Sequence, residues 1–540
     1  MTFKRNRKEI VMFEKLNKPS MPLARLALVS GILLSGCTGE ETGSSSTAAS
    51  GSSNPANGGG GAATTDTGSS TGVAGDETSL PLEDTSHFYF SYDDSASTAS
   101  RDLALFYLDQ GLLPNASWGR AYEYLNAETF GAFSPQKVGP FDLSVGAYSS
   151  SAAELMIDSE LENVAALGVN VVGPSLSQEE RPNLVLTLLV DTSGSMRSDF
   201  HTGVFESIDG VRTRMELVRY GIDKLRFSLK PGDEINLVEF NNEAQVLLEG
   251  WEYSTAGTSV HQDTLALYNE SQKLAADGTT NLDAGITLAY QVANRTYDQH
   301  KANRVIMLTD AYANTGQTDS SVIANNLTIN GMEGINFSGI GIGSGFNEGF
   351  LNELTDIGKG TYSALVTPAD ATRLFGDGFM RFVEVAVENV RFHLDFPATW
   401  RSVVSAAEES STNQSNVQTV NYSYNSEQFF FEAFSSDLPI PTTDEVTLTV
   451  SWTDTDGEDQ QDSLTLVLGN ILGAGEDRIQ AAAAVVGLAK LVSGTVNCGQ
   501  IDNSGLLELP NDHEVFKAYT AAIDQYCKLK DDDSAIPAVE

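Results

Sequence analysis

The chain has 540 residues, of which 41% are hydrophobic and 19% are charged, and its formal net charge at pH 7 is -41. This length suffices for several hydrophobic cores and suggests about three or four domains. The acidity argues against a nucleic-acid partner, because phosphate backbones are bound by basic surfaces. It is typical of a well-solvated acidic exterior, or of a surface that works in high salt or collects divalent cations.

The first 37 residues are predicted to be a signal peptide and not part of the fold. Their apolar stretch, Leu26 to Leu34, is shorter than the roughly 20 residues that a membrane-spanning helix needs. It ends in Leu34-Ser35-Gly36-Cys37, which resembles the lipobox of bacterial lipoproteins. The resemblance implies cleavage before Cys37 and a lipid anchor on that cysteine. Because Thr38 stands where inner-membrane retention requires Asp, it also implies the outer membrane of the cell envelope. The alternative is an ordinary secretory signal in which Cys37 is incidental.

Residues 38–79 and 80–182 differ sharply in composition. The first segment is mostly Gly, Ser, Thr, Ala and Asp, which bury no apolar surface, so it predicts a disordered tether. The second predicts an N-terminal α+β region. Its expected strands are 87–92, 141–148 and 163–172, and its expected helices are 98–110 and 118–129.

Residues 183–377 alternate strand and helix, which predicts an α/β fold with a doubly wound, mostly parallel sheet. The run 184–190 is continuously apolar, as a central parallel strand is. The other expected strands are 234–240, 244–251, 305–309 and 335–342. The expected helices are 215–229, 265–276, 282–297, 350–357 and 369–375.

Residues 378–475 change to a period of two and predict an antiparallel β-rich region, with strands at 390–396, 417–423, 428–434, 446–452 and 463–467. Residues 476–540 predict a C-terminal helical region, with helices at 479–492 and 514–528. The apolar segment 479–492 is short and carries Lys490, so we expect a core helix rather than a membrane span. The sequence leaves open whether strands of the two flanking regions pair into one platform.

Cys498 and Cys527 are the two cysteines of the chain other than the predicted lipid-anchored Cys37. Outside the cytoplasm, a lone pair of thiols favours a disulfide, here between the ends of two C-terminal helices. The alternative is two buried free cysteines.

Three short segments offer hard oxygen ligands that fit one metal site. Asp191, Ser193 and Ser195 follow the first strand of the α/β region, Thr280 precedes a helix, and Asp310 follows a later strand. Ligands in such folds bind beyond the carboxyl ends of the strands, where these loops converge. A set of hydroxyls and two carboxylates suits Mg²⁺ or Mn²⁺, which favour octahedral sites and keep some waters.

The spacing Asp-x-Ser-x-Ser at 191–195, Gly-Thr-Thr-Asn-Leu at 278–282 and Thr-Asp at 309–310 is similar to the metal-ion-dependent adhesion site of von Willebrand factor type A domains. The resemblance implies Ser193, Ser195 and Thr280 as direct ligands, and Asp191 and Asp310 as ligands either directly or through water. It implies Mg²⁺, with Mn²⁺ or Ca²⁺ as alternatives, and a sixth position taken by Asp or Glu of a partner protein. Residue 311 is Ala where many members have Gly, and we expect only a small effect on loop shape.

The loop from 196 to 213 carries three acids beside the predicted site, Asp199, Glu206 and Asp209. One hypothesis is that one of these carboxylates occupies the sixth position at rest and is displaced by a partner. The alternative is that they are ordinary solvent-facing acids of a variable loop.

From about residue 90 to the C-terminal region, in stretches such as 93–97, 111–114, 280–291 and 303–306, the chain resembles bacterial lipoproteins that carry a type A domain between extra regions, although this likeness is loose outside the α/β region. We therefore expect a membrane-anchored, extracytoplasmic protein-binding lipoprotein with an adhesion or scaffold role. No catalytic residue is predicted, because the six histidines are scattered and neither a nucleophile elbow nor a phosphate loop occurs. The alternatives are a structural envelope component whose metal only stiffens the loops, and a metal-assisted hydrolase.

Overall fold

The computed structural model describes residues 86–92, 97–151, 154–155, 161–201, 207–255, 259–312, 314–316, 334–347, 350–351, 354, 361–376, 378–454 and 457–531. The predicted signal peptide with Cys37, the tether and Glu206 lie outside these residues, as does most of the helix expected at 350–357. Within the described ranges, no helix is both long enough and apolar enough to cross a membrane.

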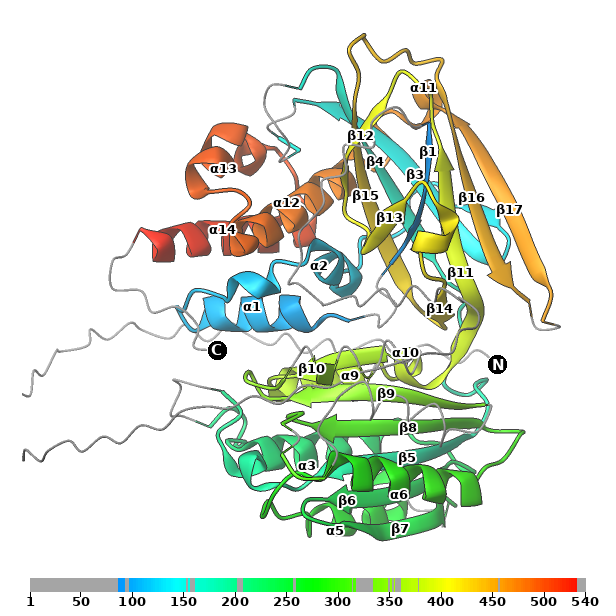
Figure 1. The fold of residues 1–540 in the computed structure, drawn as a ribbon, viewed down its shortest axis with the longest axis vertical. Coiled ribbons are helices and arrows are strands. Elements are labelled where there is room, and N and C mark those ends of the chain that lie inside the picture. The colour runs from blue at the N-terminus through cyan, green and yellow to red at the C-terminus, as the bar shows by residue number, and fades with distance from the viewer. Residues whose placement is uncertain are drawn as a thin grey trace, which may run out of the picture. The chain divides into compact units, whose positions relative to one another are not determined.

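Six strands form the sheet of the α/β domain (Figure 1). They are β5 (Leu184–Asp191), β6 (Glu234–Phe240), β7 (Ala244–Glu252), β8 (Ala302–Thr309), β9 (Ile335–Ile342) and β10 (Thr361–Leu365). The strand order is β10-β9-β8-β5-β6-β7. All neighbours are parallel except β6 and β7, which pair antiparallel because a three-residue turn connects them.

Helices cover both faces of this sheet, which confirms the predicted fold class. One face carries α3 (Arg214–Leu225), α5 (Leu265–Ser271), α9 (Pro368–Phe375) and α10 (Phe379–Val383), and the other carries α6 (Leu282–Arg295). Alternate residues of β5 point to the two faces of the sheet: Leu188 lies in the same core as Leu217 of α3, and Leu189 lies in the same core as Ile286 of α6. Two short helices, η2 (Gly194–Arg197) and α4 (Val260–Asp263), lie in the loops.

Two further sheets are built jointly from both flanking regions. The first has the order β13-β1-β11-β16-β17 with β14 also paired to β11, and the second has the order β12-β15-β4-β3-β2. Their strands are β1 (His87–Ser91), β2 (Gln136–Val138), β3 (Phe141–Ser150), β4 (Val164–Val172), β11 (Val385–Asp395), β12 (Arg401–Ser405), β13 (Glu409–Ser411), β14 (Val420–Ser423), β15 (Glu427–Ser435), β16 (Glu445–Thr453) and β17 (Asp459–Val467). Because β1 pairs with β11, and β4 pairs with β15, the flanking regions share one platform. An aromatic core fills the space between these two sheets; it includes Phe88, Phe90, Phe392, Phe430 and Phe434.

Three helices pack against the second sheet: α2 (Ala121–Ala127), α11 (Leu468–Ile471) and α12 (Glu476–Ser493). The neighbouring helices are α1 (Ala99–Asp109), α13 (Cys498–Ser504), α14 (Glu514–Lys530), η1 (Ala116–Trp118) and η4 (Leu506–Glu508), whereas η3 (Gln414–Asn416) contacts β13 of the first sheet. Residues 479–492 of α12 are buried around the whole circumference of the helix, Lys490 included. This helix packs against β3, β4, β15, α2 and α14, so the segment expected to be a core helix is one.

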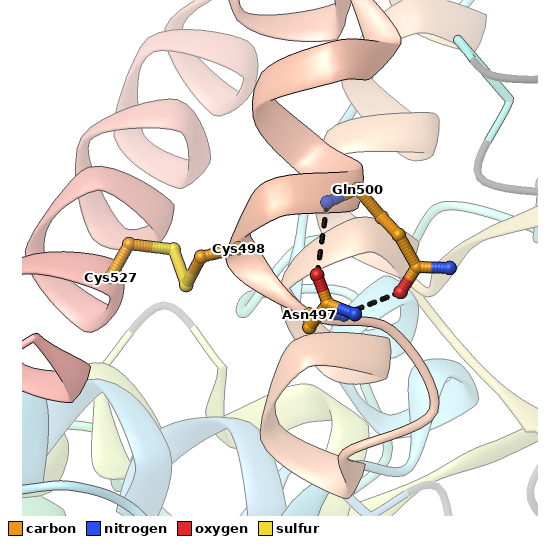
Figure 2. Close-up of a disulfide and its surroundings, with 4 residues drawn as sticks. All are labelled: Asn497, Cys498, Gln500 and Cys527. Carbon is orange, nitrogen blue, oxygen red and sulfur yellow. Dashed lines mark hydrogen bonds between the residues drawn. A yellow bond between two sulfur atoms is a disulfide. The ribbon is translucent and has the colours of Figure 1, made fainter.

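The disulfide between Cys498 and Cys527 joins α13 to α14 (Figure 2). Asn497 and Gln500 form a capping box that starts α13 at Cys498: the side chain of each accepts a hydrogen bond from the backbone N–H of the other. The cap fixes where the helix begins, and so fixes the direction in which Cys498 leaves it.

Side chains from the platform contact the α/β domain at α1. The Arg373 guanidinium of α9 binds Asp102 of α1 at 2.7 Å, and the Asp102 carboxylate also accepts from the hydroxyl of Thr98 at 3.0 Å. The ring of Phe106 lies 6.0 Å from that of His201, in the loop that follows η2. The platform therefore touches the loop that carries the predicted serine ligands.

Some local predictions were wrong. The helix expected at 118–129 is broken into η1 and α2 at Gly119, where an added Cβ would lie 2.4 Å from Ser493 N of α12. This close approach needs a glycine, and only the tertiary fold reveals it. The strands β2, β10, β12 and β13 and the helix α13 were not predicted, because their few residues carry too weak a periodic signal.

The buried carboxyl group of Glu432 in β15 should make the stability of the folded protein depend on pH. It alternates with Phe431 and so faces the aromatic core with Phe430; its Oε1 accepts from Ser405 Oγ at 3.0 Å, while Oε2 is buried without a hydrogen-bond partner. Burial raises the pKa of this carboxyl well above its usual range. Because the folded state holds the proton more tightly than the unfolded chain does, the protein loses stability as pH rises above the usual glutamate pKa, until the raised pKa is passed.

We expect Glu432→Gln to remove this loss. In urea denaturation, the variant's stability relative to wild type should grow with rising pH by up to about 1.4 kcal/mol per pH unit across that window. Glu445→Gln, on the exposed start of β16, is the control and should track wild type. A difference that stays constant with pH would show that Glu432 is not held protonated.

Candidate metal centre

The predicted ligands lie at the carboxyl ends of two neighbouring strands and in the adjoining loops. Asp191 is the last residue of β5, and Asp310 directly follows β8, which is parallel to β5 and paired with it at Val190 and Leu308. Ser193 is the N-cap of η2 and Ser195 lies within it. Thr280 comes from the loop that leads into α6. The fold thus delivers the three segments to one edge of the sheet, as doubly wound folds do.

Hydrogen bonds orient Asp191 and the two serines. Asp191 Oδ1 accepts from Ser193 N at 2.8 Å, and Asp191 Oδ2 accepts from Thr309 Oγ1 at 2.7 Å. The hydroxyls of Ser193 and Ser195 are hydrogen-bonded to each other at 3.0 Å, a separation that two ligands of one small cation could also have. Each oxygen of Asp191 is therefore held in place while the serine pair stays close together.

Backbone contacts fasten the Thr280 loop to the serine loop. Gly194 N donates to Gly278 O at 3.0 Å, and an added Cβ on Gly194 would lie 3.0 Å from that same oxygen. This close approach of a second loop requires a glycine at position 194. Asn314 was not predicted as a site residue. Its Oδ1 accepts from Thr280 N at 2.9 Å, and its Nδ2 lies 3.5 Å from Thr280 Oγ1, so it positions the threonine.

Asp310 has one satisfied and one unsatisfied carboxylate oxygen. Its side chain is fully buried; Oδ2 accepts from Nη1 of Arg214 at 2.5 Å, and Oδ1 has no hydrogen-bond partner. Burial, and secondly the negative charge of Asp310, raise the pKa of Asp191 to about 6. Two buried carboxylates of this kind repel each other, and each gains from a nearby cation.

The residues present fit a divalent cation of the Mg²⁺ class. They supply a buried carboxylate oxygen without a partner, a close pair of serine hydroxyls, a positioned threonine and a second oriented carboxylate. Within the described ranges, no group of three or more His, Cys, Asp or Glu side chains forms a metal site. The hydroxyl-rich set at this edge of the sheet therefore suits a hard cation rather than zinc of the thiolate or imidazole type.

Ala311 adopts a conformation that favours glycine. Its φ is 59° and its side chain is buried, while its N–H donates to Thr309 Oγ1 at 2.8 Å. The loop therefore keeps a left-handed turn even though Ala stands there, at a cost of about 1–2 kcal/mol in backbone strain. The small effect on loop shape expected from Ala at this position stays a prediction.

Asp199 and Asp209, the two loop acids within the described residues, have surroundings that differ from those expected of a carboxylate at the sixth coordination position. Both carboxylate oxygens of Asp199 accept from Arg212, at 3.0 Å and 3.2 Å. Asp209 lies exposed in a turn with φ of 52°. For these two acids the arrangement favours the solvent-facing alternative, and the hypothesis for Glu206 stays a prediction.

Residues 186–313 match the family model for the von Willebrand factor type A domain. The α/β domain has a von Willebrand factor type A fold. The match covers all three ligand segments, from Asp191 to Asp310.

Two curated relatives and one solved structure are similar to this chain. The uncharacterized protein YfbK of Escherichia coli strain K12 is 27% identical over 240 residues, which are 44% of this chain and 38% of that protein. Inter alpha-trypsin inhibitor heavy chain 4 of Mus musculus is 24% identical over 211 residues, which are 38% of this chain and 20% of that protein. The chain thus spans well under half the length of either relative. The solved structure of a von Willebrand factor type A protein from Catenulispora acidiphila is 14% identical, with a TM-score of 0.40 over 76% of this chain and 95% of that one.

Proposed function

We propose that the chain is a lipid-anchored protein of the cell envelope whose type A domain binds another protein through a Mg²⁺ or Mn²⁺ ion. A type A domain suggests a role in protein interaction or adhesion. The ligands in this proposal are Asp191, Ser193, Ser195, Thr280 and Asp310. The anchor is the lipid predicted at Cys37, outside the described residues. The cation, when bound, supplies a coordination position for an Asp or Glu carboxylate of the partner.

The observation that supports this proposal best is the buried, unpartnered Oδ1 of Asp310. A buried carboxylate oxygen without a hydrogen-bond partner costs free energy, roughly 1–3 kcal/mol or more for a charged group. The adjoining loops supply hydroxyls and a second carboxylate, which are oxygen ligands, while the guanidinium of Arg214 binds the other oxygen of Asp310. A cation at this place would satisfy Asp310 and separate the charges of Asp310 and Asp191.

The chain's own residues prepare this position. Thr309 and the N–H of Ser193 fix Asp191, Asn314 fixes Thr280, and Gly194 lets the two loops meet. Such preorganisation lowers the ordering cost of binding. A structural metal, or a metal that assists hydrolysis, would use the same ligands, so the alternatives differ in what occupies the open position.

Water exchange on bound Mn²⁺ separates these alternatives. We expect Mn²⁺ bound to the purified protein to enhance water-proton relaxation, and acetate, as a carboxylate probe, to lower that enhancement by displacing a coordinated water. Asp199→Ala is the matched control: it removes a nearby acid that Arg212 holds, and should change neither signal. Bound Mn²⁺ with no exchangeable water would contradict the protein-binding proposal and favour a structural metal. Turnover that Asp191→Ala abolishes would favour the hydrolase.

A further inference from the structure

Arg214 lies at the candidate metal centre although it belongs to none of the three ligand segments. It is the first residue of α3, and its Nη1 donates to Asp310 Oδ2 at 2.5 Å while its Nη2 donates to Gly345 O at 3.3 Å. The Arg214 side chain is 11% exposed and that of Asp310 is 0% exposed. Water therefore screens this ion pair far less than it screens a pair on the surface.

The surrounding loops are shaped to hold this side chain. Arg214 N donates to Ser198 O at 3.0 Å, three residues beyond Ser195. Gly343 has φ of 81°, and an added Cβ there would lie 3.0 Å from Arg214 Nε and 2.8 Å from Phe200 O. The arginine thus connects the end of β8, the end of β9 and the serine loop.

Helix stability does not explain a cation at this position. The first turn of a helix favours acidic side chains, because the N-terminal end of the helix dipole is positive. The same turn already has a capping box, formed by Thr213 and Glu216. The interaction that offsets the unfavourable placement of Arg214 is its contact with Asp310.

We propose that Arg214 is a resident counter-cation that competes with the divalent ion for the charge of Asp310 and so sets the cation affinity of the centre. This inference rests on the proposed function. Arg214 neutralises one of the two buried carboxylates, which lowers the electrostatic attraction for an incoming ion and adds direct repulsion. Binding of the ion weakens the Arg214–Asp310 pair. Through Arg214 N and Ser198, this change reaches the loop that carries Ser195.

The test compares Mg²⁺ and Mn²⁺ titration calorimetry on chelator-stripped protein. We expect Arg214→Gln to bind either ion about tenfold more tightly or better than wild type, because it keeps a hydrogen-bond donor and removes the charge. We expect Arg214→Lys, which keeps the charge and loses the planar fork, to stay within about threefold of wild type. Without a divalent ion, Arg214→Gln should melt at a lower temperature than wild type, since Asp310 loses its partner.

Arg212→Gln is the matched control. Arg212 carries the same charge two residues away, but it pairs with Asp199 and its side chain is 54% exposed. Its loss should change the ion affinity by less than about threefold, because exposed charges are screened. An equal gain in Arg212→Gln and Arg214→Gln would overturn the inference, since bulk charge alone would then explain the effect.

The outcomes separate this inference from the proposed function. Binding to wild type that Arg214→Gln leaves unchanged or weakens overturns the inference alone. Ion binding that is detected in Arg214→Gln and not in wild type supports the inference, because the arginine then prevents the divalent ion from binding. If neither protein binds an ion, both proposals fail. If Arg214→Gln does not fold, Arg214→Lys provides the test. Because this variant keeps the positive charge, a tenfold change in its affinity for the divalent ion would contradict the inference that the charge of Arg214 competes with the ion.

Discussion

Arg181→Met is expected to lower the free energy of unfolding by about 3–5 kcal/mol, because it leaves the buried carboxylate of Asp233 without its counter-charge. Both side chains of this ion pair are fully buried, and Arg181 binds the two Asp233 oxygens with Nη1 and Nη2. Asp233 Oδ1 also accepts from Leu184 N at 3.0 Å, and Oδ2 accepts from Lys230 N at 2.7 Å. The pair thus fixes the starts of β5 and β6, at the edge of the sheet opposite the candidate metal centre. Urea denaturation followed by circular dichroism measures the loss.

Arg295→Met is the control for this prediction. Arg295 binds Glu249 in a similar two-nitrogen arrangement, at 2.7 Å and 2.9 Å, but both side chains are 39% or more exposed. Its removal should cost no more than about 1 kcal/mol. The double variant Arg181→Met/Asp233→Asn should lose less than Arg181→Met alone, since no unpaired charge stays buried. Equal small losses in the buried and exposed pairs would contradict the argument.

The double variant Cys498→Ser/Cys527→Ser is expected to lose about 3–4 kcal/mol of stability, because the unfolded chain regains the freedom of a loop of about 30 residues. The loop contains η4 and most of α13 and α14, and both cysteines pack against the core that includes α12. Urea denaturation of the region should therefore begin at a lower concentration in the variant. Intact mass with and without reductant establishes the bond independently.

Reduction of the wild-type protein is the matched control. Dithiothreitol should shift its unfolding transition toward that of the double variant and leave the variant unchanged. A transition that neither reduction nor substitution moves would mean that α13 and α14 separate from the rest before the main unfolding step, so that the cross-link does not stabilise it.

The main strands of the α/β domain were predictable because buried parallel strands are continuously apolar. The run at 184–190 and the alternation that follows it give the correct fold class and place Asp191 and Asp310 at one edge of the sheet. The joint platform was not predictable, since pairing of β1 with β11 joins residues about 300 positions apart and period-two patterns do not encode their partners.

The residues of the candidate site that belong to a sequence motif were predictable, and those that reach the site only through the fold were not. Fixed spacing marks the serines and aspartates, and the Gly-Thr-Thr-Asn-Leu segment marks Thr280. Arg214 and Asn314 belong to none of these segments, and the sequence does not show which groups their side chains reach. Only the fold shows that Arg214 binds Asp310 and that Asn314 positions Thr280.

The most direct test of the central claim is a thermal melt of chelator-stripped protein titrated with Mg²⁺, Mn²⁺ and Ca²⁺, beside Asp191→Ala. An ion that binds only the folded state should add about 2.7 kcal/mol of stability at 100 times its dissociation constant. We expect Mg²⁺ or Mn²⁺ to raise the melting temperature of wild type and not that of Asp191→Ala. A wild-type melting temperature that no divalent ion changes, or an equal rise in Asp191→Ala, would contradict the claim that these residues form a cation site.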